Sequence, residues 1–133
     1  MIALPPVNIL AAIVAAAAVF LTGGLYWAVL TPVWSRRLGR PPEEARPTPA
    51  GLVVAFVTRV VVACVLAVFA AWAGVRGADS GAEIGFLAWL GFVVPLAIGQ
   101  AAFERRPWQA TAIGLAESLI GFVLMGAIVG AWR

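Results

Sequence analysis

Four long apolar runs follow one another along the chain, separated by short polar segments. A helix needs about 20 apolar residues to cross the hydrocarbon core of a bilayer, and the runs have that length. Because lipid offers no water to backbone polar groups, such segments are expected to be helices. The predicted spans are about residues 7–30, 50–74, 83–102 and 109–132. The pattern predicts an all-α polytopic membrane protein, a four-transmembrane-helix bundle forming one domain over residues 1–133.

Proline and tryptophan mark the ends of these runs. Pro49 and Pro107 precede the second and fourth runs, and Pro32 follows the first. Proline is tolerated in the first turn of a helix and tends to end a preceding one. Tryptophan prefers the headgroup zone of a bilayer. Five of the six tryptophans fall at predicted span ends: Trp27, Trp34, Trp72, Trp108 and Trp132.

The composition excludes a water-soluble globule. Of the 133 residues, 63% are hydrophobic and 11% are charged, whereas a soluble domain carries about a quarter charged residues. Residues 1–8 contain no Lys or Arg, and the apolar run that follows is too long for the core of a signal peptide. We therefore expect the first run to be a membrane span.

The nine basic residues are all arginine, and their distribution predicts the orientation. One side of the predicted bundle holds Arg36, Arg37, Arg40, Arg46, Arg105 and Arg106. The opposite side holds only Arg76 and Arg133. Because arginine-rich loops stay in the cytoplasm, both termini are expected outside. An arginine-only basic set in an Ala-, Gly- and Val-rich chain is typical of a GC-rich bacterial genome, so we expect the bacterial inner (plasma) membrane. Topology explains the basic charge, and no nucleic-acid partner is expected.

The first loop is rich in proline and has no apolar periodicity, so it is expected to be an extended linker. Near its start, Arg36 and Arg37 lie close to Trp34. These three side chains have the chemistry to bind anionic lipid headgroups. The simpler interpretation is that the two arginines only determine the topology.

Small residues at four-residue spacing predict where the helices pack. In lipid, close approach comes from small side chains rather than from hydrophobicity. The third run contains Gly91, Pro95 and Gly99, and the fourth contains Gly126 and Gly130. Pro95 is expected to kink its helix and to free a backbone carbonyl. We expect these positions to pack the bundle and to leave surface for self-association.

Two charges lie inside the apolar runs. Arg59 follows Pro49 by ten residues, and Glu117 follows Pro107 by ten residues. At 1.5 Å per residue both side chains would lie about 15 Å deep, near the bilayer midplane. A lone charge is costly there, so each is the natural partner of the other. We predict an Arg59–Glu117 ion pair. The possible polar neighbours are Thr22, Thr58, Ser118 and, nearer the cytoplasmic end, Gln100.

The predicted pair has two interpretations. As a structural element, it would set the register between the second and fourth helices. As a functional one, Glu117 would exchange protons or coordinate a cation, with Arg59 beside it. The chain has no His, and its single Cys64 lies in an apolar run. We therefore expect no catalytic residues, no metal site and no cofactor.

Several segments resemble an uncharacterised bacterial membrane protein family, domain of unknown function 1761. The resemblance is carried by residues 85–93 (GFLAWLGFV), 103–107 (FERRP) and 125–132 (MGAIVGAW), with Asn8 at the start of the first span and residues 24–27 (GLYW) near its end. It covers most of the chain and implies four helices in a single domain. It implies no activity. Family members often carry Asp, Tyr or His in the last helix where this chain has Gly114, Glu117 and Ser118.

These observations favour a non-enzymatic helix bundle that acts through protein or lipid contacts, as a homo-oligomer or as an accessory subunit of a larger membrane complex. The alternative is a small proton- or ion-coupled transporter or channel centred on Arg59 and Glu117.

Overall fold

The structure, a computed structural model, describes residues 2–39 and 48–132. Its elements are α1 (Ile9–Leu38), α2 (Pro49–Trp72), α3 (Ala78–Ala88), the π-helical turn η2 (Trp89–Val93), α4 (Val94–Glu104) and α5 (Trp108–Ala131). Within the described ranges, four helices are long and apolar enough to cross a membrane: Ile9–Pro32, Pro49–Trp72, Ala78–Glu104 and Trp108–Ala131. The predicted all-helical four-helix bundle is thereby confirmed.

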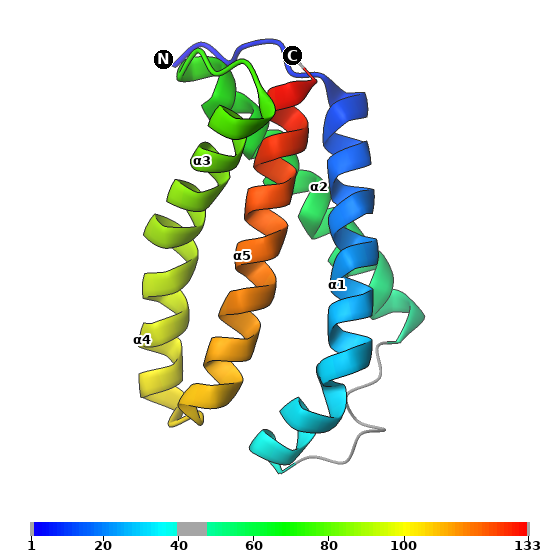
Figure 1. Cartoon of the computed structure of the whole chain (residues 1–133), viewed down its shortest axis with the longest axis vertical. Coiled ribbons are helices and arrows are strands. Elements are labelled where there is room, and N and C mark those ends of the chain that lie inside the picture. The colour runs from blue at the N-terminus through cyan, green and yellow to red at the C-terminus, as the bar shows by residue number, and fades with distance from the viewer. Residues whose placement is uncertain (1, 40–47, 133) are drawn as a thin grey trace.

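Successive long helices run in opposite directions, so the described ends of the chain lie at the same end of the bundle (Figure 1). The α5 helix contacts every other element, with α3 and α4 on one side of it and α1 on the other (Figure 1). The core consists mainly of small side chains. Its buried members are Ala12, Ala15, Val19, Ala63, Leu66, Ala67, Ala88, Met125 and Val129.

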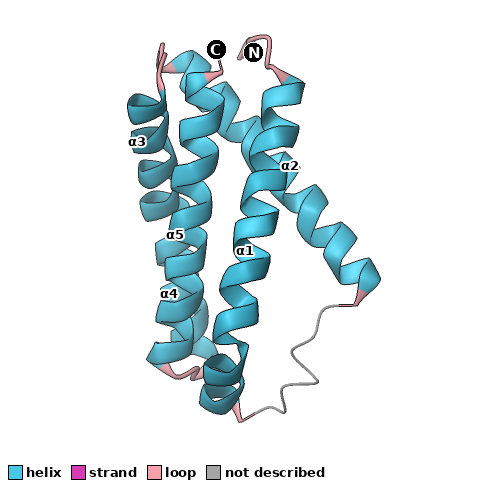
Figure 2. Cartoon of the chain, turned by 45° about the vertical axis from the view of Figure 1, so that its right-hand side comes forward, coloured by secondary structure: helices cyan, strands magenta, loops and turns pink. Residues whose placement is uncertain are grey.

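The α2 helix is inclined to the rest of the bundle. It lies against the other helices near its C-terminal end and diverges from α1 toward its N-terminal end (Figure 2). The burial pattern follows this tilt, because Ala63, Leu66 and Ala70 are buried whereas Val53 and Val54 are more than half exposed. One edge-to-face ring contact, between Phe20 of α1 and Phe56 at 5.8 Å, joins α1 to the diverging half.

The closest packing in the bundle joins α3 to α5 through glycine. A Cβ atom added to Gly81 would lie 2.1 Å from the carbonyl oxygen of Gly126, and one added to Gly85 would lie 2.1 Å from that of Phe122. On α5, a Cβ added to Gly130 would lie 2.5 Å from the carbonyl oxygen of Gly77. Only glycine permits two backbones to come this near.

This glycine packing between α3 and α5, the α3–α5 seam, agrees with the expectation for Gly126 and Gly130 but not with that for Gly91, Pro95 and Gly99. Gly126 and Gly130 lie on the α3–α5 seam, but the third helix uses Gly77, Gly81 and Gly85 there. A Cβ on Gly91 or Gly99 would meet nothing within 4 Å, and Pro95 is exposed. The expected Gly91–Pro95–Gly99 ridge therefore does not pack against another described helix of the chain, because it lies on a different side of the third helix from the seam.

The turn before Pro95 is π-helical. The N–H of Val94 donates to the carbonyl of Trp89, five residues back. Proline has no N–H to continue the α-helical pattern, and a π-turn is a common local adjustment inside a helix. The expected disturbance at Pro95 thus takes the form of η2, and α3, η2 and α4 follow one another as a single long rod (Figure 1).

Two helix boundaries differ from those predicted. Pro32 does not end the first helix, since α1 continues to Leu38. The Thr31 hydroxyl donates to the carbonyl of Trp27, whereas the carbonyl that loses its helical donor at Pro32 is that of Ala28, four residues back. The third helix begins at Ala78 rather than near residue 83, with Asp79 in its first turn, where a negative charge complements the helix dipole.

Candidate functional site

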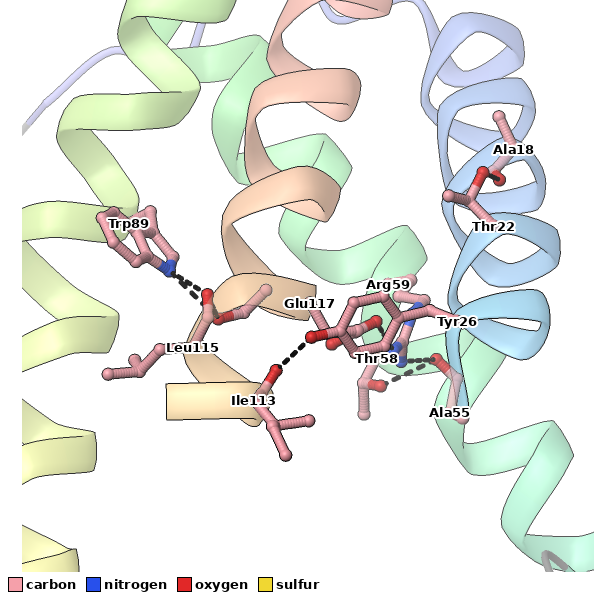
Figure 3. Close-up of polar contacts among 11 residues, drawn as sticks. Ala18, Thr22, Tyr26, Ala55, Thr58, Arg59, Trp89, Ile113, Leu115 and Glu117 are labelled. Carbon is pink, nitrogen blue, oxygen red and sulfur yellow. Dashed lines mark hydrogen bonds and ion pairs between the residues drawn. The ribbon is translucent and has the colours of Figure 1, made fainter. Parts of the chain in front are cut away.

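The two intramembrane charges are brought together in the middle of the bundle. Arg59 lies midway along α2 and Glu117 midway along α5, and the two helices run in the same direction (Figure 1). The Arg59 Nη2 donates to the Glu117 Oε1 at 3.2 Å (Figure 3). Equal distance from the two helix starts therefore did place the side chains at a common depth.

Arg59 is only partly satisfied by this contact. Its Nη1 donates to the carbonyl of Ala55, one turn earlier in α2, at 3.2 Å. Its Nε is buried and has no hydrogen-bond partner among the described residues. A guanidinium can make a paired, two-point contact with a carboxylate, but here a single contact to Glu117 is formed. The pair is thus joined by one hydrogen bond, and the Arg59 Nε–H remains available as a further donor.

The α1 helix forms the third side of this site. Gly23 lies directly against the Glu117 carboxylate, since a Cβ added there would be 2.8 Å from Oε1. One turn further along, the Tyr26 hydroxyl donates to the carbonyl of Ile113 in α5 at 2.7 Å (Figure 3). Three helices therefore meet at the ion pair: α1 at Gly23, α2 at Arg59 and α5 at Glu117.

A small cavity of about 10 Å³ opens beside Glu117, between α1 and α5. A space of this size holds about one water molecule. Its lining residues are Val19, Thr22, Gly23, Tyr26, Glu117, Ile120 and Gly121. The cavity walls are mainly apolar, and the space is too small for a hydrated ion.

The predicted polar neighbours do not bond to the pair. The hydroxyls of Thr22 and Thr58 donate to carbonyls of their own helices, those of Ala18 at 2.8 Å and Ala55 at 2.9 Å. Thr22 does reach the cavity beside Glu117. Near the helix end, Gln100 is exposed and donates to Glu104 at 3.0 Å.

Ser118 lies on another side of α5. Its hydroxyl donates to the carbonyl of Leu115, and the indole N–H of Trp89 donates to both Ser118 and that carbonyl, at 3.0 and 3.1 Å. The Trp89 side chain therefore links the π-helical turn η2 to α5 (Figure 3). Adjacent positions of a helix point about 100° apart, which is why Glu117 and Ser118 face different neighbours.

Sequence reasoning missed Gly23 and Tyr26. Glycine inside an apolar helix carries no charge or donor that marks it, so Gly23 gave no chemical signal. Tyr26, the single tyrosine of the chain, was considered only as part of a family-like motif. A hydroxyl inside a membrane span needs a hydrogen-bond partner, and this requirement could have predicted that Tyr26 contacts another helix.

The proposed headgroup residues are placed only in part. Arg36 is exposed on the last turns of α1, and its Nε donates to the carbonyl of Pro32 at 3.4 Å. The side chains of Trp34 and Arg37 lie outside the described part of the chain, as do Arg40 and Arg46. At the same end of the bundle (Figure 1), Arg106 forms an exposed ion pair with Glu104 at 2.6 Å.

The side chains at the ion pair can exchange a proton and interact through charge. In the described ranges, no group of three His, Cys, Asp or Glu side chains is placed to hold a metal ion. Cys64 is partly buried on α2. The site offers one carboxylate, one guanidinium, a tyrosine hydroxyl and space for about one water.

The chain matches a family described as a protein of unknown function (DUF1761) over residues 10–130. Comparison with curated proteins gives no match, and comparison with solved structures gives none. The matched range contains the four long helices, the glycine seam and both members of the ion pair. The chain belongs to the DUF1761 family.

Proposed function

We propose that this protein is a non-enzymatic membrane helix bundle that acts as part of an assembly in the bacterial inner membrane, with both termini outside. The observation that carries the proposal is the incomplete enclosure of the ion pair. The Arg59 side chain is 26% exposed and that of Glu117 13% exposed, at the depth where lipid solvates charge worst. A partner helix that covers this site would remove the free-energy cost of exposing the two charges to lipid.

The shape of α2 supports the same proposal. Its N-terminal half diverges from the other helices (Figure 2), and Arg59 lies next to the diverging half. The exposed side chains there are apolar, with Leu52 at 42% and Val57 at 52% exposure. A second chain packed along this half of α2 would shield the Arg59 side chain from lipid. The partner is either another copy of the chain or a larger membrane complex.

The test is native mass spectrometry of the protein extracted gently from its own host. We expect a fixed stoichiometry, either with itself or with other membrane proteins. Replacing Val53 by Trp on the exposed face of the diverging half should shift that stoichiometry, because a bulky ring would separate the partner helix. Replacing Val29 by Trp, on the exposed part of α1, is the matched control. A strictly monomeric protein would contradict the proposal.

A second function is favoured by one observation, the cavity beside Glu117. A carboxylate next to room for one water, with Tyr26 and Thr22 on the cavity wall, is an arrangement suited to proton exchange. In this alternative the protein is a small proton- or ion-coupled transporter or channel centred on Arg59 and Glu117. The carboxylate would then cycle between its paired and protonated forms.

Flux measurements separate this alternative from the first proposal. Protein reconstituted into liposomes loaded with a pH-sensitive dye should show proton flux that Glu117→Gln abolishes. The control is Glu83→Gln, which removes the same charge from an exposed position near the start of α3. Absence of flux in the unmodified protein, or equal flux in the two variants, leaves only the assembly role.

A further inference from the structure

The space that the Glu117 carboxylate occupies exists because residue 23 has no side chain. Gly23 is buried in α1, and the position of its missing Cβ is 2.8 Å from Glu117 Oε1, 3.9 Å from Glu117 Cδ and 3.7 Å from Arg59 Nη2. Ordinary contacts of a Cβ begin at about 3.4 Å. The carboxylate therefore sits in a notch in α1 that any other residue would fill.

We propose that Gly23 is a positioning residue for the Arg59–Glu117 pair. Its notch lets α1 close against the pair and holds the carboxylate against the guanidinium. The inference goes beyond the proposed function, because it concerns how the pair is held and applies whether the pair serves assembly or proton exchange. It also assigns a role to α1, which carries no charge in the described part of its membrane-spanning segment, Ile9–Pro32.

The nature of the clash makes the inference testable. At Gly81 or Gly85 an added Cβ would meet backbone atoms of α5, which cannot move alone. At Gly23 it would meet the end of a flexible side chain, which can retreat by rotation. A methyl group at position 23 should therefore leave the helices in place and displace the Glu117 carboxylate by about half an ångström from its position beside Arg59.

The neighbouring glycine supplies a matched control. Gly24 lies one residue later in the same helix, is exposed, and would place a Cβ with nothing within 4 Å. Gly24→Ala makes the same chemical change as Gly23→Ala and raises helix propensity equally. A second control is Gly121→Ala, whose Cβ would press on Val19 of α1 at 3.1 Å without touching the pair.

The experiment compares unfolding midpoints of the purified full chain in lipid nanodiscs. We expect Gly23→Ala to lower the midpoint and Gly24→Ala to leave it unchanged or raise it. Glu117→Gln should lower the midpoint of the unmodified protein, yet add little in the Gly23→Ala background, because the pair is already displaced. In the Gly121→Ala background, Glu117→Gln should keep its full effect.

Shortening the carboxylate side chain provides the rescue. Glu117→Asp withdraws the carboxylate by one methylene, so it should lower the midpoint of the unmodified protein and raise that of Gly23→Ala. If Gly23→Ala does not yield folded protein, recovery of folded protein by adding Glu117→Asp is the readout. Equal midpoints for the Gly23 and Gly24 variants, additive effects of Glu117→Gln, or no rescue by Asp would each overturn the inference.

The outcome is independent of the test of the proposed function. Native mass spectrometry reports stoichiometry, whereas the midpoints report the interaction of residues 23 and 117 within one chain. A monomeric protein with full rescue by Asp would remove the assembly role and support the positioning role of Gly23.

Discussion

At the scale of single residues, the Arg59–Glu117 contact joins two charges inside the bundle. Its single 3.2 Å hydrogen bond lies midway along two helices, where lipid on the outside cannot solvate either charge. Such a pair gains little over a matched apolar pair, but breaking it leaves one charge without compensation. The pair is therefore better suited to setting how α2 meets α5 than to adding net stability.

This asymmetry predicts the behaviour of a mutant cycle. Arg59→Met and Glu117→Gln should each destabilise the protein, by about 3 kcal/mol, because each leaves one charge without its partner where lipid cannot solvate it. The double variant Arg59→Met/Glu117→Gln should be more stable than either single variant, since no lone charge remains. Reversible unfolding in micelles measures all three. Additive losses in the double variant would show that the two side chains do not interact.

A second prediction concerns the hydroxyl that links α1 to α5. Tyr26→Phe removes only the hydrogen bond to the Ile113 carbonyl, and it should cost about 1 kcal/mol, typical of one hydrogen bond between membrane helices. Thr22→Val, whose hydroxyl bonds within its own helix, should change stability less. The same unfolding assay measures both variants. Equal losses of stability would show that the Tyr26 hydrogen bond does not stabilise the contact between α1 and α5.

At the scale of helices, glycine decides which surfaces meet. The α3 and α5 backbones touch along Gly77, Gly81 and Gly85 on one side and Gly126 and Gly130 on the other, which maximises van der Waals contact where no hydrophobic driving force exists. The π-helical turn then follows, tied to α5 through Trp89. The seam thus holds the half of the third span nearer the chain termini, and the Trp89 contact continues the attachment beyond it.

The seam predicts a sharp contrast between glycines of the same helix. Gly85→Ala would put a methyl carbon 2.1 Å from the Phe122 carbonyl oxygen, so the helices must separate, at a cost of about 3 kcal/mol or more. Gly99→Ala, with nothing within 4 Å, should be neutral or stabilising, by up to about 1 kcal/mol. Unfolding in micelles tests the contrast. A tolerated Gly85→Ala would mean that α3 and α5 do not touch as described.

At the scale of the whole molecule, charge and tilt determine how the bundle lies in the membrane. The end of α1 and the turn between α4 and α5 lie at the end of the bundle opposite the termini (Figure 1), and they carry Arg36, Arg105 and Arg106. Exposed aromatic residues are at the same end, with Phe103 at 92% and Trp108 at 73% exposure. Between α2 and α3, at the other end, the chain carries Arg76. An arginine-rich end is typical of the cytoplasmic side, whereas aromatic side chains mark both membrane interfaces.

The orientation can be tested with cysteine labelling. In a Cys64→Ser background, a membrane-impermeant maleimide applied to intact cells should label Ala78→Cys, at the start of α3, but not Phe103→Cys, near the end of α4. Both positions are exposed, and neither change alters an arginine. Permeabilised cells should show labelling at both positions. Labelling of Phe103→Cys alone in intact cells would reverse the proposed topology.

The sequence alone was sufficient for the four membrane helices, because span length is a local property set by bilayer thickness. It also predicted the Arg59–Glu117 pair, since equal distance from the starts of two parallel helices implies similar depth and a lone charge in lipid needs a partner. The helix ends were less predictable. Pro32 lies inside α1, because a proline within a membrane helix can be tolerated, and residue type alone does not reveal whether it ends the helix.

Only the tertiary structure decided which face of each helix is turned inward. In water, an amphipathic pattern marks the buried face, but in lipid both faces are apolar and the signal disappears. Gly91 and Gly99 are spaced by twice the four residues that separate Gly81 and Gly85, yet only the latter pair meets α5. The role of Gly23 was hidden for the same reason. The absence of a side chain at position 23 matters only because α5 packs there and places the Glu117 carboxylate against it.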